Sequence, residues 1–318
     1  MLEGMRRRSV RRTIAVPAMC LLAACGNGNA SGEVDTDGAT DAGLSVRAAF
    51  YPLQWIAEQV GGSVVSVQSL TPPGAEPHDL ELGPQDVAAI GEADLVVFLA
   101  EFQPAVDEAV EQEAADTFFD AAEHTELDLT YTPIEEGAEE TEEAGSTDPH
   151  FWLDPLRLAE VADALAARLG QLDSDNAGTF TANMETLRTA LEELDTELKQ
   201  GLAACESTDL VTSHNAFGYF AEAYGLTQVG ITGVTPEEEP STEDLAEVAD
   251  FVEENDVRTI YYETLVSPAI ADTVAAETGA QTALLDPLEG LTDESAGSDY
   301  LEVMRSNLDS IRAGQPCI

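Results

Sequence analysis

Three of the four histidines in this chain lie where a folded protein could use them to bind a metal ion. His78, in "TPPGAEPHDLEL", follows the apolar run "VVSVQSL", and His214 follows the apolar run "DLVTS". His150 lies between two Asp-Pro dipeptides in "STDPHFWLDP", and the second dipeptide suits the start of a helix. Neutral imidazole is a common metal ligand. His124, in "AAEHTEL", has no such placement, and we interpret it as a surface residue.

Carboxylates also follow apolar runs of this kind. Glu76 precedes His78, Glu263 follows "RTIYY", and Asp286 follows "QTALL" in "LLDPLEG". Because open α/β sheets bind ligands beyond the carboxyl ends of their strands, these side chains are candidates for one common site. Three histidines and one carboxylate form a ligand set that suits Zn²⁺, whereas oxygen ligands alone would suit Mg²⁺, Ca²⁺ or Mn²⁺.

The spacing of the histidines does not by itself establish a metal site. The intervals between His78, His150 and His214 are long and lack the short-range regularity of a His-Glu-x-x-His helix. A histidine that follows a proline is also a common hydrogen-bonding residue of turns. The residues alone therefore leave two interpretations open, a shared metal site and a set of separate turn histidines.

Apolar and amphipathic runs alternate from Ser45 onward, and this alternation predicts the elements that would position the site. The strand–helix cadence begins at "SVRAAF" and begins again at "DLVTSH", which predicts two α/β lobes with mostly parallel sheets. A long stretch without proline between them predicts one rigid helix. We expect an N-terminal lobe at residues 45–172, a linking helix at 173–204 and a C-terminal lobe at 205–318, with the metal site in the cleft between the lobes.

The first 25 residues are typical of an export signal. Five arginines precede a short apolar run, and "LLAAC" ends in cysteine, as in bacterial lipoprotein signals. We expect residues 1–24 to be removed as a signal peptide and Cys25 to carry the lipid that anchors the protein to the cell membrane. Residues 25–44 contain few apolar side chains and predict a flexible tether. An ordinary secretory signal is the alternative, and either signal places the protein outside the cytoplasm.

The charge of the chain limits its partners. Its 62 Asp and Glu face 13 Lys and Arg, which gives a formal net charge of -49. Such a surface repels phosphate backbones, so we expect no binding of nucleic acid and favour cations as ligands. The other interpretation is that the acidic side chains only keep the protein surface solvated. The acidic loop at residues 133–147 could concentrate divalent cations weakly, but without further histidines it should not form a tight second zinc site.

Two of the four cysteines remain if Cys20 leaves with the signal and Cys25 carries a lipid. In an oxidising compartment we expect Cys205 and Cys317 to form a disulfide that attaches the C-terminus to the middle of the chain. Two independent thiols are the alternative.

Five segments occur in this order: "AAFYPLQWIAEQVGG", "GAEPHDLELGPQDVAAIGEADLVVF", "DPHFWLDP", "VTSHNAFGYFAEAYGL" and "LLDPLEGL". Their combination and spacing resemble the zinc and manganese solute-binding proteins of ABC importers, in particular the zinc-uptake lipoproteins. The resemblance begins at Ser45 and reaches the C-terminus. It implies a two-lobed α/β fold with one metal ion between the lobes. The family's ligand positions correspond to His78, His150, His214 and Asp286.

The resemblance also implies residues around the ligands. Glu263, in "YYETLVSP", matches a family-typical glutamate near the site that would orient a histidine through its other ring nitrogen. We expect Glu76 in a similar outer position. Manganese-binding relatives tend to carry glutamate at the third ligand position, so His214 favours zinc.

The implied function is capture of Zn²⁺ with high affinity outside the cytoplasm and its delivery to the membrane permease of an ABC importer. We expect a monomer that is not an enzyme. A manganese- or iron-binding member of the same transport class is the first alternative. An exported zinc hydrolase is another, with Glu263 or Glu76 as base, but the sequence contains no nucleophile elbow or His-Glu-x-x-His motif. A cell-surface adhesin or scaffold would be supported by repeats, and none is evident in the sequence.

Overall fold

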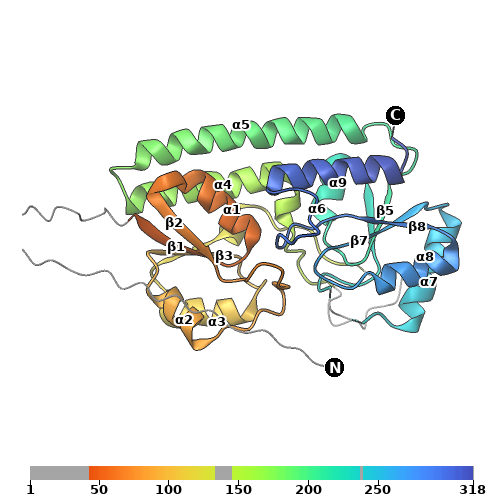
Figure 1. Ribbon diagram of the computed structural model, residues 1–318, viewed down its shortest axis with the longest axis horizontal. Helices are drawn as coiled ribbons and strands as arrows, with labels where there is room; N and C mark the ends of the chain where they lie inside the picture. Colours follow the sequence, from red (N-terminus) through yellow and green to blue (C-terminus); the bar gives the residue numbers. More distant parts are fainter. Residues whose placement is uncertain (1–42, 133–144, 237–238, 318) are drawn as a thin grey trace, which may run out of the picture. The chain divides into compact units, whose positions relative to one another are not determined.

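The computed structural model describes residues 43–132, 145–236 and 239–317 (Figure 1). The expected signal peptide, the lipidation site Cys25 and nearly all of the expected tether lie outside the described residues, as do residues 133–144 of the acidic loop. The described residues cluster into a single unit, to which all elements below belong.

The first sheet contains four parallel strands in the order β2-β1-β3-β4. Every side chain of β3 is buried, as expected for an apolar strand in a sheet that is covered on both faces. The apolar pattern does not predict β4, which is only three residues long. The strands are β1 (Leu44–Ala48), β2 (Val65–Ser69), β3 (Leu95–Phe98) and β4 (Phe118–Asp120).

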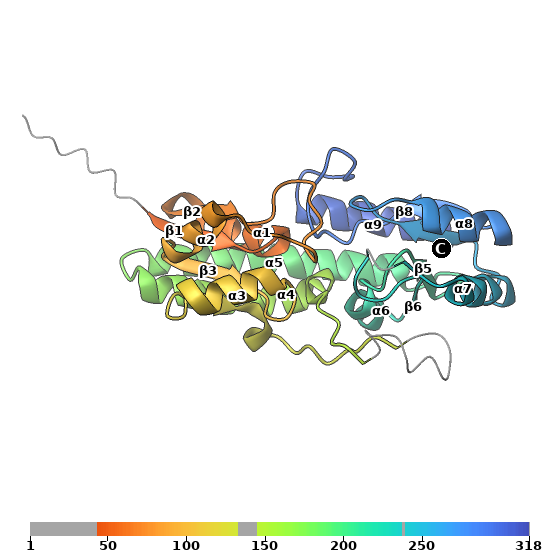
Figure 2. The same cartoon turned by 90° about the horizontal axis from the view of Figure 1, so that it is seen from below.

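Three helices connect or follow these strands. Each carries a proline in its first turn, where the backbone N–H groups have no partner within the helix and where proline therefore fits. Helices α2 and α3 lie on the side of the first sheet that faces away from α5 (Figures 1 and 2). The helices are α1 (Tyr51–Gly61), α2 (Pro84–Gly91) and α3 (Pro104–Glu113).

The second sheet repeats the order of the first, as β6-β5-β7-β8, and is again parallel. Helices α7 and α8 pack against one face of it through a cluster of small apolar side chains, mainly valine and alanine. The strands are β5 (Asp209–Thr212), β6 (Thr227–Gly230), β7 (Thr259–Tyr262) and β8 (Gln281–Leu284). The helices are α6 (Gly218–Tyr224), α7 (Thr242–Glu254) and α8 (Ala269–Thr278).

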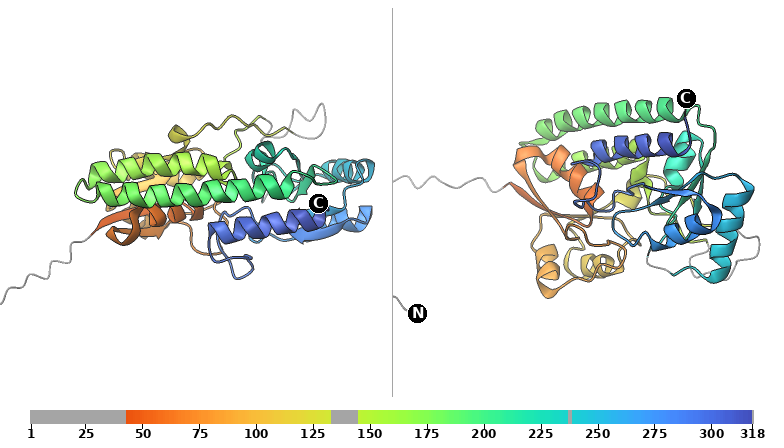
Figure 3. Two further views of the ribbon diagram at one scale, coloured as in Figure 1. Left: turned by 90° about the horizontal axis from the view of Figure 1, so that it is seen from above. Right: turned by 45° about the vertical axis from the view of Figure 1, so that its right-hand side comes forward.

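A layer of long helices joins the two sheets. Helix α5 has 26 residues, and at about 1.5 Å per residue it extends roughly 40 Å. Figure 1 shows it running past both sheets, and Figure 3 shows α4, α5 and α9 side by side. The buried side chains of α5 recur every three or four residues, as on one face of a helix. These helices are α4 (Pro155–Leu172), α5 (Ala177–Leu202) and α9 (Tyr300–Gly314). The predicted fold, two parallel α/β lobes joined by one long helix, is confirmed.

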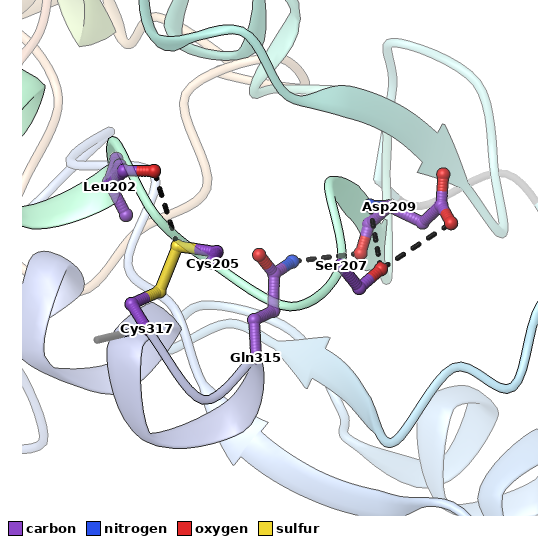
Figure 4. Close-up of a disulfide and its surroundings, with 6 residues drawn as sticks. All are labelled: Leu202, Cys205, Ser207, Asp209, Gln315 and Cys317. Atoms are coloured by element: carbon purple, nitrogen blue, oxygen red, sulfur yellow. Dashed lines mark hydrogen bonds between the residues drawn. A yellow bond between two sulfur atoms is a disulfide. The ribbon is translucent and has the colours of Figure 1, made fainter.

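The predicted disulfide is present between Cys205 and Cys317, which are 112 residues apart in the sequence (Figure 4). Cys205 follows α5 and Cys317 follows α9, so the bond ties the ends of these two packed helices. Close by, the side-chain amide of Gln315 donates a hydrogen bond of 2.8 Å to the backbone oxygen of Asp209, at the start of β5.

Replacing both cysteines with serine is expected to lower the free energy of unfolding by about 2–5 kcal/mol, because the disulfide closes a long loop and restricts the unfolded chain. Denaturant unfolding of the metal-free protein measures this loss. Wild-type protein in which the disulfide has been reduced is the matched control and should show a similar loss. Equal stability of the oxidised wild type and the double variant would contradict the prediction.

Within the described residues, no helix combines the length and the apolar character that a membrane span requires.

Candidate metal site

Three imidazole rings and one carboxylate come together from loops of both sheets. The Nε2 atoms of His78, His150 and His214 lie 3.4, 3.2 and 3.3 Å from Oε1 of Glu289. The possible ligand atoms of these four residues all lie within 4.8 Å of one another. Among the residues that the structure describes, this is the one group of His, Cys, Asp or Glu side chains close enough together to hold a metal ion. Each of the four side chains is at most 7% exposed.

His78 lies in the loop between β2 and α2, and this loop is held by its neighbours. Oε1 of Glu76 accepts the backbone N–H of His78 at 2.8 Å. The buried side chain of Gln103 donates a hydrogen bond of 3.0 Å to the backbone oxygen of Pro77. The ring of Phe102 packs against that of His78, with centroids 4.5 Å apart. These contacts give the imidazole one defined direction.

His150 is fully buried just before a 3₁₀ turn, η3 (Phe151–Leu153), which leads into α4. Oδ1 of Asp148 accepts hydrogen bonds from both the backbone N–H of His150, at 2.9 Å, and its Nδ1, at 2.8 Å. The ring of Trp152 packs beside the imidazole, with centroids 5.1 Å apart. Hydrophobic patterning does not reveal the role of Asp148, although the Asp-Pro-His pattern places a carboxylate two residues before the ring.

His214 follows β5, and its partner Glu263 follows the adjacent strand β7. Nδ1 of His214 lies 2.7 Å from Oε1 of Glu263, and the hydroxyl of Ser213 donates to the same oxygen at 2.5 Å. Because paired parallel strands end at the same edge of a sheet, the two side chains meet directly beyond that edge. The structure thus places Glu263 behind His214, on the side away from Glu289.

The carboxylate in the group is Glu289, whereas the family resemblance implies Asp286 in this role. Asp286 is buried, but its Oδ1 accepts the backbone N–H of Leu288 at 2.8 Å and its Oδ2 accepts the hydroxyl of Ser295 at 2.8 Å. Asp286 therefore closes its own turn, and the chain then turns through Leu288 and presents Glu289 to the histidines. The sequence signal was present in "LLDPLEG", which contains two carboxylates three residues apart.

Glu76 and His124 lie outside the group of four. Oε2 of Glu76 is buried and has no hydrogen-bond partner. Burial, together with the negative charge of Glu289, raises the pKa of Glu76 to about 9. His124 is half-buried and stacks on the ring of Phe119, with centroids 4.5 Å apart.

The electrostatics of the group favour an anionic carboxylate among basic imidazoles. Burial would raise the pKa of Glu289, but hydrogen bonds from the three histidines hold it well below its usual value. Burial would lower the pKa of His214, but the charge of Glu263 and the hydrogen bond to it raise this pKa well above 6.5. The pKa of His150 is raised in the same way by Asp148, whereas burial lowers that of His78.

The hydrogen bonds also orient the ring nitrogens. Ionised carboxylates only accept hydrogen bonds, so Nδ1 of His150 donates to Asp148 and Nδ1 of His214 donates to Glu263. In their neutral forms, both rings therefore present the Nε2 lone pair to the centre of the group. Lone pairs and a carboxylate oxygen repel one another at this distance unless a cation lies between them. The arrangement can bind a metal ion that accepts nitrogen and oxygen ligands, of which Zn²⁺ is the best fit.

Two parallel α/β lobes with such a group of ligands between them define a class, the metal-binding solute-binding proteins. The chain matches the family model for zinc-uptake complex component A, periplasmic, over residues 46–314. The high-affinity zinc uptake system protein ZnuA of Bacillus subtilis (strain 168) is 35% identical over 307 residues, or 92% of this chain and 93% of that protein. The chain belongs to the zinc-uptake complex component A family.

Solved structures and a longer relative agree with this assignment. The Zn(II)-bound ZnuA-like domain of Streptococcus pneumoniae AdcA is 32% identical, with a TM-score of 0.71 over 86% of this chain and 99% of that one. The laminin-binding protein Lmb of Streptococcus agalactiae is described as a bifunctional protein with adhesin and metal transporting activity. It is 33% identical, with a TM-score of 0.75 over 86% of this chain and 100% of that one. The zinc-binding lipoprotein AdcA of Streptococcus pneumoniae (strain R6) is 34% identical over 86% of this chain, which spans 56% of that protein.

Proposed function

We propose that this protein captures Zn²⁺ outside the cytoplasm and delivers it to the permease of an ABC importer. His78, His150, His214 and Glu289 would hold the ion, which is cargo and not a catalytic cofactor. The observation that carries the proposal is the convergence of three imidazole Nε2 atoms on one buried carboxylate oxygen, at 3.2 to 3.4 Å. The names of the relatives, a zinc uptake system protein and a zinc-binding lipoprotein, support it.

Zinc is favoured over manganese by the nitrogen content of the site. Three imidazoles and one carboxylate suit a borderline cation, whereas manganese prefers a larger share of oxygen ligands. His214 is the residue that decides this balance, because glutamate at its position would give a set of two nitrogens and two oxygens.

Delivery requires that the protein work close to the membrane. We propose that Cys25 carries a lipid anchor, that residues 25–44 act as its tether, and that the protein is a monomer when it meets the permease. The lipoprotein name of the AdcA relative supports the anchor. Because ligands come from loops of both sheets, binding of the ion would cross-link the two lobes, and docking on the permease would separate the ligands to release it.

Metal analysis of protein purified without added metal, combined with titration against a zinc chelator of known affinity, tests the proposal. The wild type should retain one equivalent of zinc, and His214→Glu should shift the retained metal toward manganese. His124→Ala is the matched histidine control and should behave as the wild type. A wild type that binds neither zinc nor manganese more tightly than the chelator does would overturn the proposal.

Zinc affinity is expected to rise with pH through and above the usual imidazole range. In the metal-free protein the pKa values of His150 and His214 are raised, so both rings lose their protons at a higher pH than an ordinary histidine, and zinc competes with those protons. Chelator competition from about pH 6 to about pH 8.5, spanning the usual imidazole pKa of about 6.5, measures the change. An affinity that stays constant over this range would contradict the raised pKa values.

The stability of the metal-free protein should change with pH in the opposite direction. A histidine whose pKa is raised on folding adds stability that is fully present below its unfolded pKa of about 6.5 and is lost as the pH rises through the folded value. The difference in melting temperature between the zinc-loaded and metal-free forms should therefore widen as the pH increases. A difference that narrows would show that the two histidines are not held in their protonated forms.

A further inference from the structure

The turn that carries Glu289 contains an unusual backbone conformation. Leu288 has a positive φ of 59°, in the left-handed region that residues with side chains rarely adopt, and its side chain is fully buried. A residue in this conformation persists only where the surrounding structure fixes it. The contacts around Leu288 therefore decide where the next residue, Glu289, points.

Asp286 provides the contacts within the turn. Its Oδ1 accepts the backbone N–H of Leu288 and its Oδ2 accepts the hydroxyl of Ser295, each at 2.8 Å. Both carboxylate oxygens are thus used at once, one to close the turn and one to attach it to the loop that leads to α9. Neither oxygen belongs to the group formed by the histidines and Glu289.

The backbone of the turn is also fixed from outside. The side-chain amide of Asn307, on α9, donates to the backbone oxygen of Asp286 at 2.7 Å and accepts its N–H at 2.9 Å. Nε1 of Trp152, beside His150, donates to the backbone oxygen of Pro287 at 2.8 Å. With its base anchored on both sides, the turn has Asp286 Oδ1 as the acceptor of the Leu288 N–H.

We propose that Asp286 is a positioning residue of the metal site, whose carboxylate holds the Leu288 turn so that Glu289 faces the three histidines. The inference rests on the proposed function, because it requires Glu289 to bind the ion. Asp286 would act through the backbone of Leu288 and not by contact with the metal. Its carboxamide analogue should therefore serve nearly as well, because Asn also accepts the Leu288 N–H and can exchange a hydrogen bond with Ser295.

Zinc affinity by chelator competition, with X-ray absorption spectra of the bound zinc, tests this on Asp286→Asn and Asp286→Leu. The leucine variant should bind zinc on the order of 10- to 100-fold more weakly, the usual cost of losing a group that orients a ligand. Its spectrum should keep three imidazoles and lose the carboxylate oxygen. The asparagine variant should retain most of the affinity and the wild-type spectrum. Ser295→Ala, which removes one of the two contacts and leaves Asp286 in place, should show a smaller loss.

Three outcomes would overturn the inference. Asp286→Leu could bind zinc as tightly as the wild type. Asp286→Asn could lose as much affinity as Asp286→Leu, which would indicate that the charge itself acts on the metal. If Asp286→Leu does not fold, wild-type zinc affinity in Ser295→Ala would overturn the inference instead. Glu289→Gln separates the two proposals, because wild-type affinity in that variant would overturn the ligand set of the proposed function, whereas failure of the Asp286 variants alone leaves that set intact.

Discussion

His150→Ala is expected to bind zinc about 100- to 1,000-fold more weakly than the wild-type protein. Four-ligand zinc sites bind with about 10–16 kcal/mol, so one ligand contributes roughly 2.5–4 kcal/mol. Each 1.4 kcal/mol corresponds to about a tenfold change in affinity. His150 is fully buried and its Nε2 lies 3.2 Å from Oε1 of Glu289, so the substitution removes one of the four ligand atoms from the centre of the group.

Chelator competition with the purified variant measures this loss, and His124→Ala is the control for removing a histidine. His124 stacks on Phe119 and lies outside the group of ligands, so its variant should keep the affinity of the wild type. A melting curve of the metal-free His150→Ala variant establishes that it folds. Wild-type affinity in a folded His150→Ala variant would remove this residue from the site.

Trp152→Ala is expected to lower the free energy of unfolding of the metal-free protein by about 3–5 kcal/mol, the usual cost of removing a large buried aromatic side chain. Trp152 is fully buried, and its ring packs against Phe50 and Phe102, with centroids 4.9 and 5.5 Å away. The substitution also leaves the backbone oxygen of Pro287 without its donor. Denaturant unfolding measures the loss.

Trp152→Phe separates the packing from the hydrogen bond. It keeps an aromatic ring but lacks Nε1, so its loss should be smaller, about 1–3 kcal/mol for the unpaired buried oxygen and the smaller ring. Phe118→Ala is the control for removing an aromatic ring from the surface, because Phe118 is 37% exposed. A Trp152→Ala variant no less stable than Phe118→Ala would contradict the stabilising role of this buried ring and its hydrogen bond.

Most of the fold follows from hydrophobic patterning, because short buried strands and longer amphipathic helices leave different periods in a sequence. The alternation restarts after the long helical region, and that restart predicts the second lobe. The strand β4 has only three residues and leaves no such period. Its position at the sheet edge is fixed by pairing with β3, a contact between segments about twenty residues apart.

The site was predictable where ligands follow strands and less so elsewhere. His78 and His214 lie in the loops that follow β2 and β5, so their convergence follows from the topology of parallel sheets. The choice between Asp286 and Glu289 depends on the left-handed backbone of Leu288, and neither composition nor periodicity records a single dihedral angle. Gln103 and Asp148 act through hydrogen bonds to loops, which a pattern of apolar residues does not report.

A crystal structure of the zinc-loaded protein, with anomalous diffraction at the zinc edge, tests the central claim most directly. It should show one ion bound by Nε2 of His78, His150 and His214 at about 2.0–2.1 Å and by a carboxylate oxygen of Glu289 at about 2.0–2.2 Å. Zinc bound elsewhere, or bound by fewer than three of these imidazoles, would contradict it.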